Sequence, residues 1–250
     1  MATYYAMLIR RSLLVTVRDL REIRDVDNME VWRSRFDHTV QDRFRSEFPA
    51  EIERAIAGIT AAHRALDLFR SQLQGSNQMA TIDLFFHSAV NSVLCSLHHL
   101  VSGYPIAAGN LMRHYTESVA MALLCLDSSI GVLDAFSRDR KHYPVHDAPT
   151  KLRKKTVRRI LEAKLAFDPD AWETVLEIAE LYDQLSHASA LSLGFQLMVD
   201  TDDMMIIGSE YDPAKREPYR SDLVRRASAA ESLAHLIEVA TGILPKREAA

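Results

Sequence analysis

Residues 109–124 read GNLMRHYTESVAMALL, and this stretch decides the fold class. Small and apolar residues recur along it at helical spacing, which predicts a core helix. Three titratable side chains nevertheless stand inside it, namely Arg113, His114 and Glu117. Arg113 and Glu117 are one helical turn apart, so they share a face and can pair. The stretch therefore predicts a helix that combines a core position with a charged pair.

The same helical periodicity covers most of the chain on both sides of this stretch. Helices are expected near residues 4–25, 29–46, 49–73, 79–102, 109–127, 129–137, 150–166, 169–186 and 221–242. The pattern changes near 195–211, where two short apolar runs flank Thr201-Asp202-Asp203 and predict a hairpin. The predicted fold class is all-α, an antiparallel multi-helix bundle with one small β-hairpin near 195–211.

Length and composition predict one helical domain. The chain has 250 residues, is 48% hydrophobic and has a net charge of -4. The apolar residues are numerous enough to form one large core. The small negative net charge shows that the chain as a whole is not a polycation. We expect a single domain over 1–250, with 1–47 as an N-terminal helical arm and 48–250 as the core bundle.

The sequence also favours a cytoplasmic protein without cofactors. Cys95 and Cys125 lack metal-binding spacing and are expected as buried thiols. No apolar run approaches the roughly 20 residues that span a bilayer, and no signal peptide is recognisable, so no membrane contact is expected. The histidines form no HExxH motif and no pair of Glu-x-x-His helices, so no metal site is expected.

The charged pair has two interpretations. A buried Arg–Glu pair is often no more stabilising than apolar residues of the same shape, so it either fixes helix register or serves a ligand. In the second case Glu117 holds Arg113 and presents it to an anion or a carboxylate. His87 and Asn91 belong to a polar stripe on the 79–102 helix, which either faces water or lines a crevice with this pair.

A third polar group follows at residues 181–194, LYDQLSHASALSLG. Histidine can exchange a proton near neutral pH, but no G-x-S-x-G elbow supports a hydrolase triad. The alternative is a cluster that caps the end of a helix. The ligand-binding candidates are therefore Arg113, Glu117, His87, Asn91, Tyr182, Ser186 and His187.

Two of these segments carry a resemblance to known proteins. The motifs G-x-L-x-R-x-x-x-E, from Gly109 to Glu117, and Y-x-x-L-S with a histidine, from Tyr182 to His187, resemble those of a poorly characterised bacterial all-helical family. That family is distantly similar to abortive-infection and HEPN-type proteins. The resemblance covers roughly residues 80–190 and implies an all-helical fold and, through the abortive-infection proteins, a role in phage defence.

HEPN ribonucleases cut RNA without a metal, through an R-x(4–6)-H motif. Arg33 with His38 and Arg140 with His146 have this spacing. Chance alone produces such matches in a chain rich in arginine and histidine, and neither match begins a predicted core helix.

A basic segment at residues 138–159 is the second candidate site. It holds nine Lys or Arg against two Asp, a local charge of +7. Such a cluster indicates a phosphate-bearing partner, and the alternative is the solvated face of an amphipathic helix. No aromatic residue interleaves on the 150–166 helix, so single-strand stacking is not supported there. The nucleic-acid candidates are Arg140, His146, Lys154, Lys155, Arg158 and Arg159.

Two functions follow as hypotheses, and the sequence leaves open whether the protein is an enzyme. The first is a binding or interaction protein, a homo-oligomer, that holds an anionic ligand or partner at a crevice beside Arg113 and Glu117. The second is a HEPN-like metal-independent ribonuclease that acts on RNA bound at residues 138–159.

Overall fold

The computed structural model describes residues 38–73, 75–165, 176–183, 209 and 211–244. Every element in these ranges is a helix, which confirms the all-α prediction. The elements are α3 (Thr39–Glu47), α4 (Pro49–Gln72), α5 (Asn77–Val101), α6 (Pro105–Leu124), η2 (Ser128–Ile130), α7 (Val132–Arg138), η3 (Val145–Asp147), α8 (Ala148–Leu152), α9 (Lys155–Leu165), η4 (Pro213–Lys215) and α12 (Arg216–Ile243). A further helix covers residues 176–183. The predicted hairpin near 195–211 lies outside the described residues, apart from Ser209 and Tyr211, and stays a prediction.

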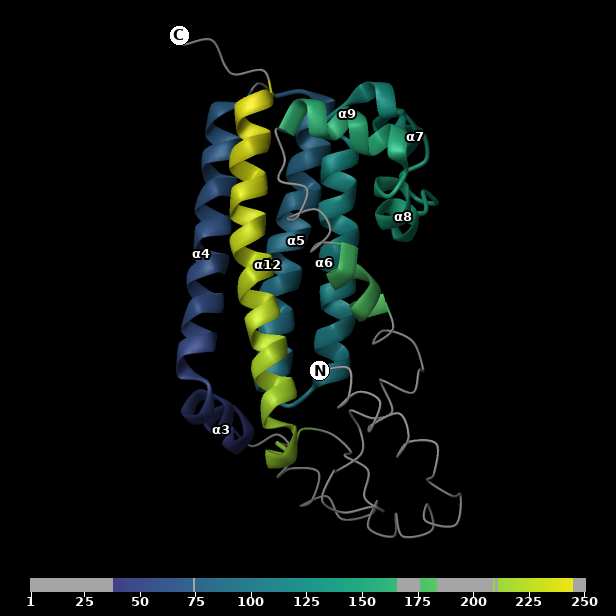
Figure 1. Ribbon diagram of the computed structural model, residues 1–250. Helices are drawn as coiled ribbons and strands as arrows, with labels where there is room; N and C mark the ends of the chain where they lie inside the picture. Colours follow the sequence, from purple (N-terminus) through teal and green to yellow (C-terminus); the bar gives the residue numbers. More distant parts are fainter. Residues whose placement is uncertain (1–37, 74, 166–175, 184–208, 210, 245–250) are drawn as a thin grey trace, which may run out of the picture.

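Four long helices, α4, α5, α6 and α12, stand side by side and form the bundle (Figure 1). Local sequence sets where they begin. Pro49 and Pro105 occupy the first turns of α4 and α6, where a missing backbone N–H costs nothing. The side chain of Ser76 accepts a hydrogen bond from the backbone N–H of Met79 and caps α5. Gly103, with φ of 81°, supplies the tight turn between α5 and α6.

The bundle is not antiparallel throughout. Arg220 contacts Glu51 near the start of both helices, and Glu231 contacts Arg54 farther along both. α12 therefore runs parallel to α4, whereas α5 runs opposite to α4, α6 and α12 (Figure 1). The antiparallel prediction is wrong for the α4–α12 pair, because the chain between α6 and α12 returns to the end of the bundle where α4 begins.

Small residues let α4 and α12 approach closely. A Cβ atom added at Gly58 would lie 3.0 Å from the Cβ of Ala230 and 3.3 Å from the backbone oxygen of Ala227. Ala55 and Ala62, on either side of Gly58, are fully buried. Their small size brings the two backbones together and increases the dispersion contacts between the helices.

The predicted N-terminal arm, 1–47, lies mostly outside the described residues. Its described end, α3, packs against the bundle through Phe44, which is fully buried. The ring of Phe44 lies 5.8 Å from Phe48 and 5.0 Å from Tyr219 on α12, in tilted arrangements that aromatic rings favour. These contacts join α3 to the bundle.

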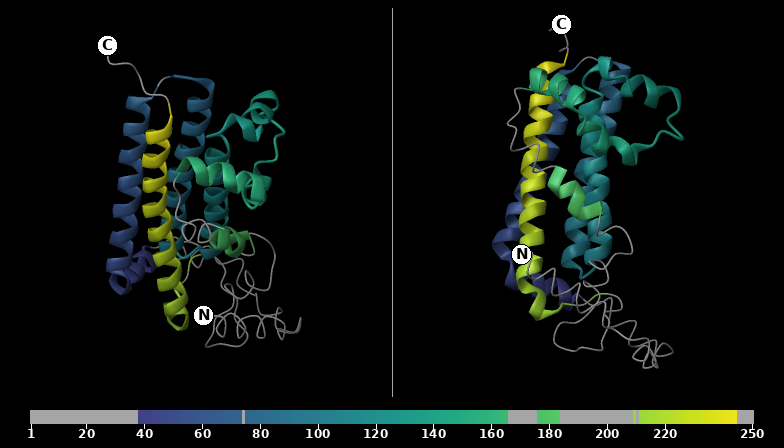
Figure 2. Two further views of the ribbon diagram at one scale, coloured as in Figure 1. Left: turned by 45° about the horizontal axis from the view of Figure 1, so that its top comes forward. Right: turned by 45° about the vertical axis from the view of Figure 1, so that its right-hand side comes forward.

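The helices α7, η3 and α8 stand to one side of the bundle, beside α6, and α9 runs from them across the bundle to α12 (Figure 2). These four elements are called the lobe. The predicted helix at 150–166 is two helices, α8 and α9. Leu152 and Val157 are both buried, yet on one continuous helix they would point about 140° apart. The break at Arg153 and Lys154 allows both apolar side chains to face inward.

Among the described helices, α5 is long and apolar enough to cross a membrane by length and composition alone. Of its most apolar 18-residue window, 56% is buried inside the bundle. The core helix of a soluble bundle has these same features.

Candidate functional site

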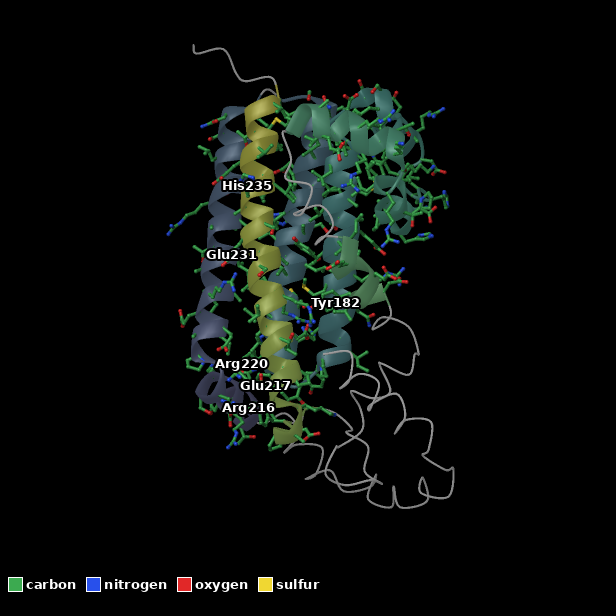
Figure 3. The ribbon with its side chains drawn as sticks, in the orientation of Figure 1. Tyr182, Arg216, Glu217, Arg220, Glu231 and His235 are labelled. Carbon is green, nitrogen blue, oxygen red and sulfur yellow. The ribbon has the colours of Figure 1, made fainter. Side chains whose placement is uncertain are left out.

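A fully buried arginine, Arg226, is the centre of a polar network inside the bundle. Its Nη1 lies 2.6 Å from Oδ1 of Asp222, one turn earlier on α12. The hydroxyl of Tyr182, on the 176–183 helix, donates to the same carboxylate at 2.5 Å and accepts from Arg226 Nη1 at 3.3 Å. Figure 3 places Tyr182 between α12 and α6. The network therefore attaches the 176–183 helix to the bundle.

The other side of the guanidinium faces α5. Arg226 Nε donates to Oγ of Ser96 at 2.8 Å, and Ser96 donates to the backbone oxygen of Ala108 on α6 at 2.7 Å. Arg226 Nη2 is buried and has no hydrogen-bond partner among the described residues. Arg226 thus connects α12, α5, α6 and the 176–183 helix through side chains that are closed to solvent.

Burial and charge set the protonation of this network. Burial alone lowers the pKa of Arg226, but the carboxylate of Asp222 and the oxygen of Tyr182 outweigh it, so the pKa is raised overall. Burial also raises the pKa of Tyr182, with the negative charge of Asp222 acting in the same direction. The network therefore holds a permanent cation beside a neutral phenol.

Sequence reasoning found Tyr182 and missed its partners. Asp222 and Arg226 are an acid and a base at i and i+4 on α12. That spacing could have predicted their ion pair from the sequence. Ser96 belongs to a second signal, the row Ser88, Ser92 and Ser96, which recurs every four residues on α5. This row faces α6.

The Arg113–Glu117 pair forms as predicted. Arg113 Nε lies 2.9 Å from Glu117 Oε1, and Asp183 Oδ1, from the polar segment at 181–194, lies 3.6 Å from the same nitrogen. The exposed fractions of Arg113 and Glu117 are 29% and 14%, so the pair lies at the edge of the core. Two carboxylates thus surround Arg113, which leaves little positive potential for an external anion.

The predicted crevice partners of this pair lie elsewhere. His87 and Asn91 are exposed on another face of α5. His87 Nδ1 is 3.3 Å from Arg70 of α4, and Asn91 accepts a long contact from Cys95. Of the two alternatives for this polar stripe, the exposure of His87 and Asn91 agrees with the one in which it faces water. The face of α5 that packs on α6 is the neighbouring serine row. Ser186 and His187 lie outside the described residues.

His114 contacts that serine row. Its Nδ1 lies 2.8 Å from Oγ of Ser92, and the same Oγ lies 2.7 Å from the backbone oxygen of Ser88. The single hydrogen of the Ser92 hydroxyl can go to the backbone oxygen of Ser88 or to Nδ1 of His114, depending on the tautomer of the ring. In either case the contact joins α5 to α6.

The basic segment lies on the lobe, and many of its cations face solvent without an acidic partner in the part of the chain that the structure describes. Asp139 and Asp147 contact His142 and His146, and neither contacts a lysine or arginine of the lobe. Three basic side chains of the lobe are engaged: Lys151 with the hydroxyl of Tyr143, Arg153 with Glu180, and Arg158 with Glu162. The exposed basic side chains without a carboxylate partner among the described residues are Arg138, Arg140, Lys141, Lys154, Lys155 and Arg159.

The residues of the R-x(4–6)-H motif are not paired within one chain. Arg140 Nη2 donates to Asn77 Oδ1 at 3.1 Å, whereas His146 Nε2 lies 3.4 Å from Asp147. Both belong to the segment around η3 and not to a core helix. The other match, Arg33 with His38, has Arg33 outside the described residues.

No protein-family model, curated protein or solved structure matches this chain. In the described ranges, no group of three or more His, Cys, Asp or Glu side chains is placed to hold a metal ion. The interpretation of both candidate sites therefore depends on their own geometry and charge.

Proposed function

We propose that this protein is a non-catalytic binding protein that holds a nucleic acid on the basic lobe. The proposal depends on a set of exposed cations that have no carboxylate partner among the described residues: Arg138, Arg140, Lys141, Lys154, Lys155 and Arg159. Exposed basic side chains gathered in one lobe attract a phosphate-bearing polymer and release its counterions. The excess of acidic charge in the rest of the chain confines this attraction to the lobe.

The contrast with the bundle supports this proposal over a merely solvated face. Within the described ranges, every arginine of α3 and α4 except Arg64 lies within ion-pair distance of a carboxylate. Arg216 and Arg220 of α12 contact Glu47, Glu51 and Glu217 at the lower end of the bundle (Figure 3). Most arginines named here are thus paired with carboxylates in the bundle, whereas six exposed cations of the lobe are not paired among the described residues.

The position of two lysines strengthens the argument. Lys154 and Lys155 stand at the start of α9, and the first turn of that helix holds no acidic residue. The helix dipole disfavours positive charge at this end by about 0.3–1 kcal/mol per side chain. Cations placed where they weaken the helix are better explained by a bound anion than by folding.

Arg113 is the weaker candidate for binding an anion. Glu117 and Asp183 already face its guanidinium, so an added phosphate or carboxylate would meet two negative charges. We therefore assign this pair to attachment of the 176–183 helix, and the anionic partner to the lobe.

Fluorescence anisotropy with a labelled nucleic acid at low salt tests the proposal. The variant Lys154→Glu, Lys155→Glu, Arg159→Glu should lose binding, because three phosphate contacts become repulsive. The matched control is Arg64→Glu, which reverses an exposed arginine on α4 that has no partner among the described residues. It should bind like the wild type. Absence of wild-type binding at low salt contradicts the proposal.

The same protein and RNA also distinguish simple binding from the ribonuclease alternative. It requires Arg140 and His146 to act together, and in one chain each contacts a different neighbour, so a homo-oligomer would have to join them. Incubation of bound RNA with chelator should leave the RNA intact. Cleavage that is abolished by His146→Ala would establish the alternative instead, and sedimentation would then show whether the active species is an oligomer.

A further inference from the structure

We infer that the basic lobe recognises the phosphate backbone of a nucleic-acid duplex, independently of base sequence. This inference rests on the proposed function and specifies its partner. It is carried by three properties of the lobe: where its cations stand, what its aromatic rings contact, and which polar side chains it lacks.

The aromatic rings of the lobe are engaged in packing. Phe136 is buried, with its ring centre 5.1 Å from that of Phe85 on α5 and 5.8 Å from that of Tyr143. The ring of Tyr143 is also covered by Lys151, whose Nζ lies 4.4 Å from the ring centre and donates to its hydroxyl at 2.7 Å. Proteins that bind single strands stack bases on exposed aromatic rings. Neither ring offers such a surface.

The remaining rings in the lobe are the two exposed imidazoles. His142 Nδ1 lies 3.1 Å from Asp139, and His146 Nε2 lies 3.4 Å from Asp147. Each ring thus has one nitrogen held by a neighbouring carboxylate. These two imidazoles are the exposed rings of the lobe on which a base could stack, and the histidine variant below tests them.

The lobe also lacks asparagine and glutamine, the side chains that recognise adenine by two hydrogen bonds to its edge. Residues 132–163 contain no Asn and no Gln. The exposed lysines and arginines bind phosphates readily, and phosphate contacts position a protein without selecting a sequence. Arginine can also bind the edge of guanine, so the two duplexes compared below must differ in guanine content. Binding through the lobe should therefore not depend on base sequence.

The cations belong to two separate elements. Arg138, Arg140 and Lys141 come from the end of α7 and the residues after it, and Lys154, Lys155 and Arg159 come from the start of α9. A duplex carries one charge per about 1.7 Å of axis, twice the density of one strand, and holds its phosphates in fixed rows. A lobe that binds through charge alone should therefore bind a duplex more tightly than a single strand.

Anisotropy titrations with one labelled sequence, offered as a duplex and as its separate strands, test the inference. The duplex should bind at least about tenfold more tightly than either strand, and its log Kd should rise with log salt by about 0.9 per contacted phosphate. Two duplexes of unrelated sequence should agree within about twofold, because no base contact discriminates between them. The double variant His142→Ala, His146→Ala should leave the duplex-to-strand ratio unchanged.

The possible failures are distinguishable. Equal or tighter binding of the single strand, reduced by the histidine variant, refutes the duplex inference and leaves the proposed function standing. A difference above about tenfold between the two duplexes refutes sequence independence, since one good base contact is worth about that much. Failure of every nucleic acid to bind at low salt refutes the proposed function itself.

Discussion

The guanidinium of Arg226 lies 2.6 Å from the carboxylate of Asp222, and both side chains are buried. A second pair with the same spacing, Arg113 and Glu117, lies at the bundle edge at 2.9 Å. The acid precedes the base in the first pair and follows it in the second, and the first order suits the helix dipole better. The protein therefore contains two matched ion pairs that differ in burial, and they should respond differently to mutation.

Removal of Asp222 alone should be strongly destabilising. Asp222→Ala leaves a buried guanidinium without its counter-charge, and the expected loss is about 3–5 kcal/mol in the free energy of unfolding. Asp222→Leu combined with Arg226→Met removes both charges and should cost less than the single change. Denaturant unfolding of the two variants measures the difference. A single variant that loses under about 1 kcal/mol would contradict the buried network.

Removal of Glu117 should cost much less. Asp183 lies 3.6 Å from Arg113 and remains as a second carboxylate, and the arginine is partly exposed. We expect Glu117→Ala to lower the unfolding free energy by about 1 kcal/mol. The same titration compares it with Asp222→Ala. A loss as large as that of Asp222→Ala would mean that Arg113 depends on Glu117 alone.

Gly58→Ala should destabilise the contact between α4 and α12. Alanine favours a helix over glycine by about 1 kcal/mol, but the new Cβ would lie 3.0 Å from Ala230 and 3.2 Å from the backbone nitrogen of Glu231. These atoms are rigid, so overpacking of about 1–3 kcal/mol should outweigh the helical gain. Gly242→Ala, in the last turn of α12 with nothing within 4 Å of the new Cβ, is the control and should be neutral or stabilising. Thermal melting of both variants checks the opposite signs.

The two cysteines should differ in reactivity. Burial raises the pKa of the Cys125 thiol to about 12, whereas Cys95 is partly exposed. Because the thiolate is the reactive form, the native protein should be alkylated at Cys95 first. In the Cys95→Ser variant, modification of Cys125 should follow the rate of unfolding and accelerate with denaturant. Fast labelling of that variant in buffer alone would show that the core opens locally around Cys125.

The Arg54–Glu231 bridge between α4 and α12 should contribute a small, acid-sensitive stability. The hydrogen bonds from Arg54 hold the pKa of Glu231 below its usual value, although partial burial opposes this. A lowered carboxyl pKa adds stability above the unfolded pKa, and this stability is lost as the pH falls through the folded pKa. Both side chains are nearly half exposed, so the contribution is under about 1 kcal/mol. Arg54→Met should be less stable than wild type near neutral pH and equal to it in acid. Arg64→Met, which removes no ion pair of the described residues, should show no such pH-dependent difference.

The sequence by itself determined the helical elements, because their signals are local. Apolar spacing placed α4, α5 and α6 within a few residues of their bounds, and Pro49 and Gly103 stand at the turns where helices begin or end. The i, i+4 spacing of Arg113 and Glu117 was sufficient to predict their contact, since a helix alone brings them together. The basic charge of residues 138–159 is likewise a property of composition.

Only the tertiary structure decided which polar side chains meet. Tyr182 and Arg226 are 44 positions apart, and Arg226 and Ser96 are 130 apart, so no local pattern relates them. The face of α5 that packs on α6 depends on how two helices rotate against each other, and the serine row occupies it while His87 and Asn91 face solvent. The parallel course of α12 beside α4 depends on the return of the chain after α6. Periodicity along a chain specifies a helix and its apolar side, whereas rotation, direction and long-range pairing follow from packing between helices.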